Sequence, residues 1–280
     1  MGPRAVSEPI YVCGHTADEL DRLRTQSAFF EDITRRVLEA AGLRRGSRVL
    51  DIGCGAGDLS RLAAELVGAD GSIVGVDRAT EAIAAAKARR ARGRAASVEF
   101  RLGSIDDVAD GRQFDALIGR FVLMHQADPA GTLRRAARHV RPGGLVVMLE
   151  SAMSACMAGL HSFPHSPTYD RITRLITDII RAAGADVSMG LRLGEVFERA
   201  GLPRPTMWLQ ARVDGGPDAA THRYITDSLR SVLPLAASLG VDGARVNVEK
   251  LEEDLRAEVV ASRSVLVSPP VVAAWTSLIE

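Results

Sequence analysis

Three glycines at alternate positions follow a short apolar run in the first quarter of the chain. Gly53, Gly55 and Gly57 come directly after Val49–Ile52, and Cys54 lies between the first two glycines. Glycine lets a ligand approach the backbone closely, and the first N–H groups of a following helix face that ligand. The spacing therefore predicts a cofactor-binding loop between a strand and a helix.

A carboxylate stands two residues before the first glycine. Dinucleotide sites carry G-x-G-x-x-G, whereas this loop reads G-x-G-x-G after Asp51. An acid at this place would repel a pyrophosphate, but it suits a cofactor with an ammonium group and no phosphate. S-adenosylmethionine (SAM) has this chemistry, so we expect SAM as the cofactor.

The chain resembles the class I SAM-dependent methyltransferases, in particular their small-molecule, UbiE-like subgroup. The resemblance rests on Asp51–Gly57, Val74–Asp77 and Arg141–Gly144 and covers residues ~45–150 strongly. It implies an α/β fold with a doubly wound, seven-stranded, mostly parallel sheet (Rossmann-like) and helical cap insertions. In that family the last strand is antiparallel, and insertions around strands five to seven form the acceptor pocket.

Alternating strand and helix patterns from Arg48 to Leu149 also indicate a doubly wound sheet. We expect an N-terminal helical lid at 1–44 and a SAM-binding core at 45–150. Residues 151–280 then complete the sheet and carry the acceptor-binding cap, at about 151–192 and 218–261.

Two late strands are expected in this last part. Thr206–Val213 has the pattern of a sixth strand, and Val265–Ser268, before Pro269-Pro270, has that of a seventh.

The adenosine portion of the cofactor has four candidate partners. Asp77 ends the second expected strand, where a carboxylate can accept both ribose hydroxyls; its alternative role is a helix N-cap. Arg78 would lie along the adenine or be solvated. The resembled family usually carries an acid for the adenine amino group where this chain has Ser104. A hydroxyl can still accept that bond, and the backbone N–H of Ile105 can reach the ring.

The methionine portion has three candidate partners. The resemblance puts Arg120, after strand four, near the methionine carboxylate or the acceptor; a structural ion pair is the alternative. It also implies that an aromatic and an amide cover the methionine portion, here Tyr11 and Gln26.

Histidines supply the candidates for proton transfer and acceptor binding. His125 occupies the region after strand four where similar O-methyltransferases place a histidine, so it is the candidate general base. Pairing with Asp128 is its structural alternative. His161, His165 and Tyr169 are candidate acceptor-pocket residues.

A metal site is not expected at the two later histidines. Pro164 disrupts a helix between His161 and His165, and no third ligand has suitable spacing.

Composition narrows the function classes. The formal net charge is zero, which gives no global attraction to nucleic acid or to an anionic membrane. The sequence shows no signal peptide and no membrane span, and its three cysteines lack metal-ligand spacing, so we expect a cytoplasmic protein with reduced thiols.

These observations favour methyl transfer from SAM to a small, apolar metabolite, with oxygen as the first acceptor atom and carbon next. One alternative is a SAM-binding protein of the same fold that transfers no methyl group. A nucleic-acid or protein methyltransferase is the other, although the chain lacks a basic surface and an Asn/Asp-Pro-Pro-Tyr-type motif after strand four. A homodimer is left open.

Overall fold

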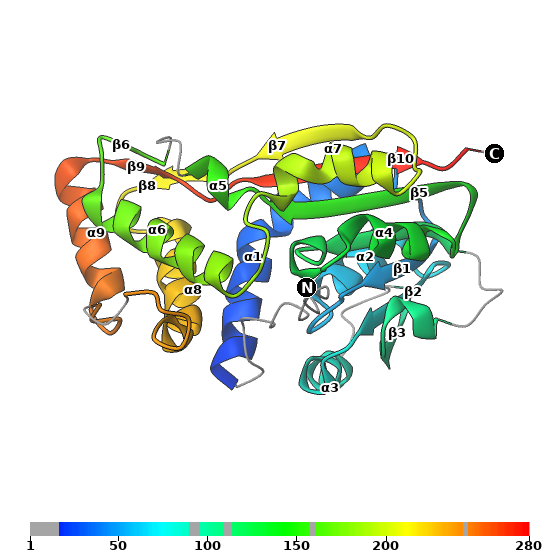
Figure 1. The fold of residues 1–280 in the computed structure, drawn as a ribbon, viewed down its shortest axis with the longest axis horizontal. Coiled ribbons are helices and arrows are strands. Elements are labelled where there is room, and N and C mark those ends of the chain that lie inside the picture. Colours follow the sequence, from blue (N-terminus) through cyan, green and yellow to red (C-terminus); the bar gives the residue numbers. More distant parts are fainter. Residues whose placement is uncertain (1–16, 90–95, 109–113, 157–160, 243–245, 280) are drawn as a thin grey trace, which may run out of the picture.

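The computed structural model describes residues 17–89, 96–108, 114–156, 161–242 and 246–279 (Figure 1). Its main sheet has seven strands in the order β3-β2-β1-β4-β5-β10-β7. In this order the strands span Ser97–Leu102, Ser72–Asp77, Arg48–Ile52, Phe114–Arg120, Val140–Ser151, Val271–Ser277 and Thr206–Gln210. Strands β3, β2, β1, β4 and β5 pair in parallel, while β10 is antiparallel to both β5 and β7. The expected doubly wound, mostly parallel sheet is confirmed.

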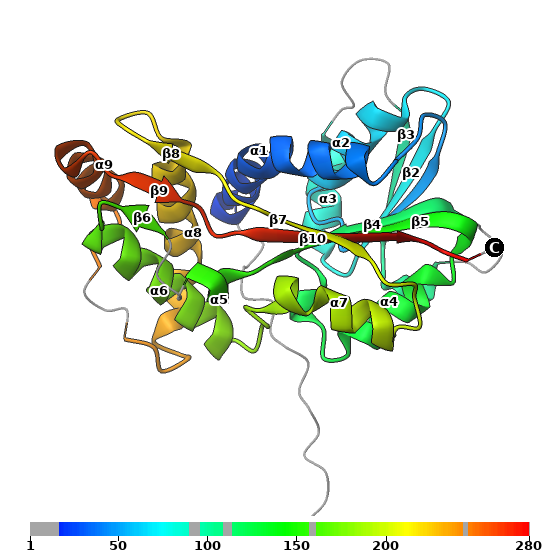
Figure 2. The same cartoon turned by 90° about the horizontal axis from the view of Figure 1, so that it is seen from above.

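Helices cover both faces of this sheet (Figure 2). On one face lie α1 (Ala17–Ala40), α2 (Asp58–Val67) and α3 (Thr80–Ala88). The other face carries α4 (Pro129–Ala137) and α7 (Met189–Arg199). Strand β1 is buried at four of its five positions, as expected for a central parallel strand covered on both sides.

A helical cap with a small second sheet extends from one end of the main sheet (Figure 1). Its helices are α6 (Pro167–Ala182), α8 (Ala220–Ala236) and α9 (Leu251–Ser262), and α8 packs against α1, α6 and α9. The small sheet has the order β6-β9-β8, with spans Ser162–Phe163, Val265–Val267 and Val213–Gly215. Short helical segments complete the fold: η1 (Ile105–Asp107), η2 (Leu123–His125) and α5 (Met153–Cys156).

The predicted positions of the last two strands need correction. The sixth strand ends at Gln210 rather than Val213, and the seventh strand of the main sheet is Val271–Ser277 rather than Val265–Ser268. Ser268 and Arg212 lie where the chain passes from the main sheet to the small sheet. The Ser268 N–H donates to the Arg212 carbonyl, and the Ser268 hydroxyl accepts from the Arg212 N–H. This crossing separates the small sheet from the main one. The proline pair follows the short strand β9, as expected, and also precedes β10.

Among the described residues, no helix is both long and apolar enough to cross a lipid bilayer.

Candidate functional site

The glycine loop connects β1 to α2 as the sequence predicts. Gly53 has φ 60° and Gly57 has φ 81°, both in the left-handed region. A Cβ on Gly53 would lie 2.6 Å from Cγ2 of Val122, whereas a Cβ on Gly55 would meet no atom within 4 Å. The backbone at Gly55 therefore faces open space. The buried Cys54 lies between them and donates its N–H to the Val76 carbonyl at 3.0 Å.

Asp77 holds this loop against the end of β2. Its Oδ2 accepts the Gly55 N–H at 2.8 Å, and its Oδ1 accepts the Ala79 N–H at 2.9 Å. Helix α3 begins directly afterwards, at Thr80. A carboxylate can accept about four hydrogen bonds, so Asp77 keeps capacity for two ribose hydroxyls.

Asp51 is fully buried at the end of β1. Its Oδ2 accepts a hydrogen bond from the Ser60 hydroxyl at 2.5 Å, while its Oδ1 has no hydrogen-bond partner among the described residues. Burial raises the pKa of Asp51 to about 7, although the Ser60 hydrogen bond and the charge of Arg120 oppose this rise. An unsatisfied buried oxygen is costly, so a donor from a ligand would stabilise it.

Ser104 takes part in a helix cap. Its hydroxyl donates to Asp107 at 2.9 Å and accepts from the Asp106 N–H at 3.2 Å, which caps η1. The hydroxyl expected to accept the adenine amino group therefore already has two partners. Asp106 is engaged as well, because it forms an ion pair with Arg135 at 3.0 Å.

A cavity of about 500 Å³ connects the glycine loop to the cap. One half of its lining contains the expected cofactor residues except Asp51, which is buried and does not line the cavity: Gln26, Gly53, Cys54, Gly55, Asp77, Arg78, Ser104, Ile105 and Arg120. The other half is apolar and comes from α1, α6, α8 and neighbouring segments: Phe30, Phe121, Met153, Ile176, Ile180, Tyr224, Ile225, Val232 and Pro269. We name these the cofactor half and the acceptor half. Tyr11 lies outside the described residues.

Arg120 and His125 both line the cavity. The Arg120 guanidinium donates to the hydroxyls of Thr34 at 3.0 Å and Ser27 at 3.4 Å. Desolvation lowers the pKa of Arg120, and the carboxylates of Asp58 and Asp51 oppose this. The alternative role of Arg120 was a structural ion pair, but its guanidinium contacts no carboxylate within the described part of the chain.

His125 ends the short helix η2, and its side chain is half-buried. The alternative role expected for His125 was pairing with Asp128. Asp128 has a different contact of its own, since its Oδ1 accepts the Gly131 N–H at 2.9 Å and caps α4.

Comparison with known proteins identifies the family. Residues 43–201, more than half of the chain, match the profile described as "Methyltransferase domain". The chain belongs to the class I SAM-dependent methyltransferase family. SAM is its cofactor, in agreement with the cavity beside the glycine loop.

This methyltransferase is also similar to curated proteins. It is 35% identical over 191 residues, 67% of this chain and 52% of the relative, to an uncharacterized 37.1 kDa protein in transposon TN4556 of Streptomyces fradiae. It is 40% identical over 113 residues, 39% of this chain and 43% of the relative, to the ubiquinone biosynthesis O-methyltransferase of Azorhizobium caulinodans. The chain thus spans about half or less of the length of these curated relatives.

A solved structure shows the same fold. The YcgJ protein from Bacillus subtilis has a TM-score of 0.55 and 15% identity, with 89% of this chain and 99% of that chain covered.

Glu150 is a site residue that the sequence analysis missed. It is fully buried at the end of β5, and its Oε1 accepts the N–H groups of Val122 at 2.9 Å and Leu123 at 2.7 Å. Its Oε2 accepts the Met124 N–H at 3.4 Å. Burial raises the pKa of Glu150 to about 7, and these backbone hydrogen bonds oppose the rise. Glu150 therefore positions the segment that leads to His125; an acid inside an otherwise apolar strand was the available signal.

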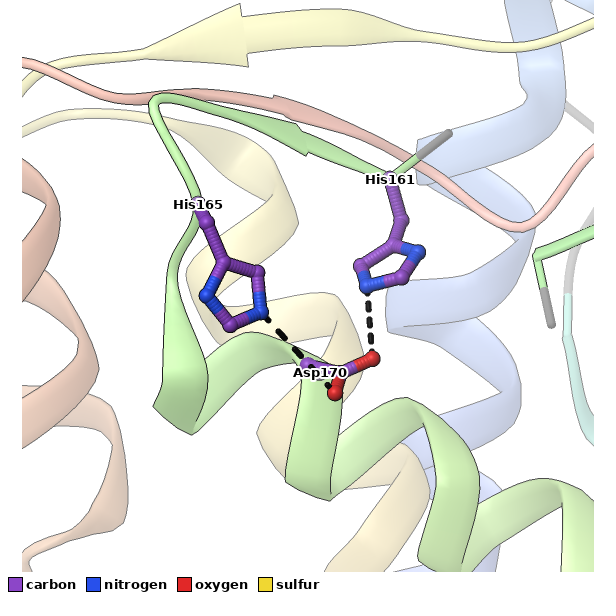
Figure 3. Close-up of side chains that lie close together, drawn as sticks. All are labelled: His161, His165 and Asp170. Carbon is purple, nitrogen blue, oxygen red and sulfur yellow. Dashed lines mark ion pairs between the residues drawn. The ribbon is translucent and has the colours of Figure 1, made fainter. Parts of the chain in front are cut away.

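His161, His165 and Tyr169 lie close to one another but away from the cavity. None of them is among the described residues that line it. The Tyr169 hydroxyl donates to the Val267 carbonyl at 2.9 Å, and the ring is fully buried. The two imidazoles instead point toward the carboxylate of Asp170 (Figure 3).

Proposed function

We propose that this methyltransferase transfers the methyl group of SAM to an oxygen atom of a small, largely apolar metabolite, with carbon as the next acceptor atom. The observation that carries the proposal is the continuous cavity, with the cofactor loop at one half and an apolar lining at the other. Methyl transfer from a sulfonium is an in-line displacement, so the protein's task is to orient the acceptor and take up its proton.

The proposed cofactor contacts follow from the chemistry of the lining. Asp77 accepts the ribose hydroxyls. Asp51 is fully buried and is not among the residues that line the cavity, so its unsatisfied Oδ1 accepts from the ammonium group through a bridging water. Arg120 pairs with the methionine carboxylate, because a desolvated guanidinium gains most from an anionic partner. Ile105 offers its backbone N–H to the adenine. Gln26 covers the methionine portion from α1.

In this proposal His125 accepts the acceptor hydroxyl's proton as general base. The histidine lines the cavity together with residues of both halves, and Glu150 holds the backbone of the preceding three residues. General-base catalysis of this kind raises the reaction rate by about 10²–10⁴-fold.

The test is a methylation assay of the purified chain with SAM and a panel of apolar phenols, enols and alcohols. We expect a product one methylene heavier, identified as a methyl ether by NMR, and a C-methyl product would select the second acceptor atom. His125→Gln should lower kcat by about 10²-fold or more while SAM affinity stays unchanged. The matched control is His139→Gln, at a histidine that does not line the cavity.

Two results would change the proposal. SAM binding without turnover on any acceptor would support a SAM-binding protein that transfers no methyl group. Full activity of His125→Gln would leave methyl transfer in place and assign His125 to structure.

A further inference from the structure

A second cluster of potential ligand atoms lies in the cap, where β6 joins α6. His161 precedes β6, His165 follows it, and Asp170 lies in the first turn of α6 (Figure 3). One donor atom from each residue lies within 4.8 Å of the others. None of the three is among the described residues that line the SAM cavity, so this cluster is separate from the proposed methyl-transfer site.

The distances in the cluster approach those of a zinc site. Nε2 of His161 lies 2.6 Å from Oδ1 of Asp170, and Nε2 of His165 lies 3.9 Å from Oδ2 of the same carboxylate. Ligands at ~2.0–2.1 Å from a tetrahedral Zn²⁺ are about 3.3 Å apart. The two observed separations lie on either side of this value, so small side-chain rotations would give the required geometry.

We propose that His161, His165 and Asp170 bind a divalent transition metal ion, with Zn²⁺ as the ion best matched to two imidazoles and a carboxylate. The three side chains supply three ligands, and water completes the coordination. The proposal revises the expectation that no third ligand accompanies the two histidines: Asp170 is five residues after His165, and the turn into α6 brings it back to them.

The surroundings give this site one fixed side and one adjustable side. The His161 side chain is only 5% exposed, and its carbonyl accepts the Val267 N–H at 2.8 Å from β9. The His165 side chain is 64% exposed and has room to rotate. A buried, anchored ligand combined with a mobile one allows the site to close around an ion.

Arg174 is the main competitor of a metal ion. Its Nε donates to both oxygens of Asp170, at 3.1 Å and 3.0 Å, but its side chain is about half exposed and can move into solvent. An aspartate carboxylate is ionised at neutral pH, as a metal ligand must be.

Bound metal would connect the small sheet to the start of α6. That helix contributes Ile176 and Ile180 to the acceptor half of the cavity. The ion would therefore stabilise the cap without taking part in methyl transfer.

The deciding experiment is calorimetric titration of the EDTA-treated full chain with ZnCl₂. We expect one Zn²⁺ per chain with micromolar affinity, weakened about tenfold or more in His165→Ala, which removes an exposed side chain and should leave the fold intact. Arg174→Gln should bind Zn²⁺ more tightly, because it removes the competing cation. His139→Ala is the control and should bind as the wild type does.

The chain has four further histidines, so the difference between variants decides the outcome. Equal binding by wild type and His165→Ala would overturn the proposal, as would the absence of any bound Zn²⁺. Either result would identify the cluster as a His–Asp–Arg hydrogen-bond network. Thermal unfolding gives an independent check: at equal ZnCl₂ concentration, Zn²⁺ should raise the Tm of the wild type by more than it raises that of His165→Ala.

Discussion

The two halves of the cavity are built in different ways. The cofactor half is formed by loops that follow β1, β2, β3 and β4, whose carboxyl ends meet at one edge of the sheet. Most of its residues are polar or glycine, and all except Gln26, which comes from α1, lie within a few residues of a strand end. The acceptor half is formed by apolar side chains from α1, α6 and α8, which lie far apart in the sequence, from Phe30 in α1 to Val232 in α8.

In the proposed function, this difference separates binding of the cofactor from choice of the acceptor. Polar groups fixed by parallel strands can meet one cofactor with defined hydrogen bonds. An apolar lining discriminates by shape and volume, and it can change by substitution without disturbing the loop. Changes in the cofactor half should therefore alter SAM binding, and changes in the acceptor half should alter the acceptor KM.

Substitution of Glu150 should affect both halves of the cavity, because Glu150 holds the backbone of residues 122–124 between them. Glu150→Ala leaves three backbone N–H groups without their acceptor, and we expect a loss of about 3–5 kcal/mol in the free energy of unfolding. Chemical denaturation measures this loss. Glu150→Gln keeps one acceptor oxygen, so it should be less destabilised and should lose kcat more than SAM affinity. An effect no larger than that of the exposed control Glu195→Ala would show that the segment is held by other contacts.

Asp77 tests the cofactor half by itself. Asp77→Ala removes the proposed acceptor of two ribose hydroxyls, and hydrogen bonds to a charged group contribute about 1.5–3 kcal/mol each. We expect SAM affinity to fall about 100-fold or more in calorimetric titration. The exposed Asp70→Ala serves as control, and unchanged affinity in Asp77→Ala would remove Asp77 from the proposed site.

Asp51 and Glu150 make stability depend on pH. Burial raises both pKa values to about 7, so the folded chain binds more protons than the unfolded chain does between about pH 4 and 7. Their contribution is complete below the unfolded pKa and is lost as the pH rises through about 7. Between about pH 5.5 and 7, each group should lower the free energy of unfolding by at most about 2 kcal/mol.

Asp51→Asn isolates one of these two contributions. An amide cannot ionise, but its oxygen can still accept from Ser60, so urea denaturation across this pH range should give a shallower decline than in the wild type. An equal decline in both proteins would mean that Asp51 keeps one ionisation state throughout. Added SAM should make the decline of the wild type shallower and bring it closer to that of Asp51→Asn, since an ammonium group near Asp51 favours the ionised carboxylate and lowers its pKa.

The sequence predicted the cofactor half far better than the acceptor half. Gly53, Gly55 and Asp77 follow strand ends, where a short local pattern determines both structure and chemistry. The seventh strand was misplaced because Val265–Val267 and Val271–Ser277 have similar local patterns, and long-range pairing alone distinguishes them. Ile176 and Tyr224 belong to no sequence motif. The same helical pattern of apolar residues occurs in a core and in a pocket, so the sequence could not assign these two residues to the cavity.

The smallest expected effect is the sharpest test of the acceptor half. Ile176 lies on α6, is 2% exposed and contacts the cavity, and Ile176→Val removes one methylene without a polar change. One buried methylene is worth about 0.8 kcal/mol, so the acceptor KM should rise about fourfold. SAM affinity should stay within error, because the cofactor half is untouched.

Val259→Ala offers a matched comparison, since this buried residue of α9 is not among the described residues lining the cavity. It should lower stability without altering the KM. If Ile176→Val changed SAM affinity and acceptor KM together, the two halves would act as one site. Selectivity among acceptors would then depend on the cofactor loop as well as on the cap.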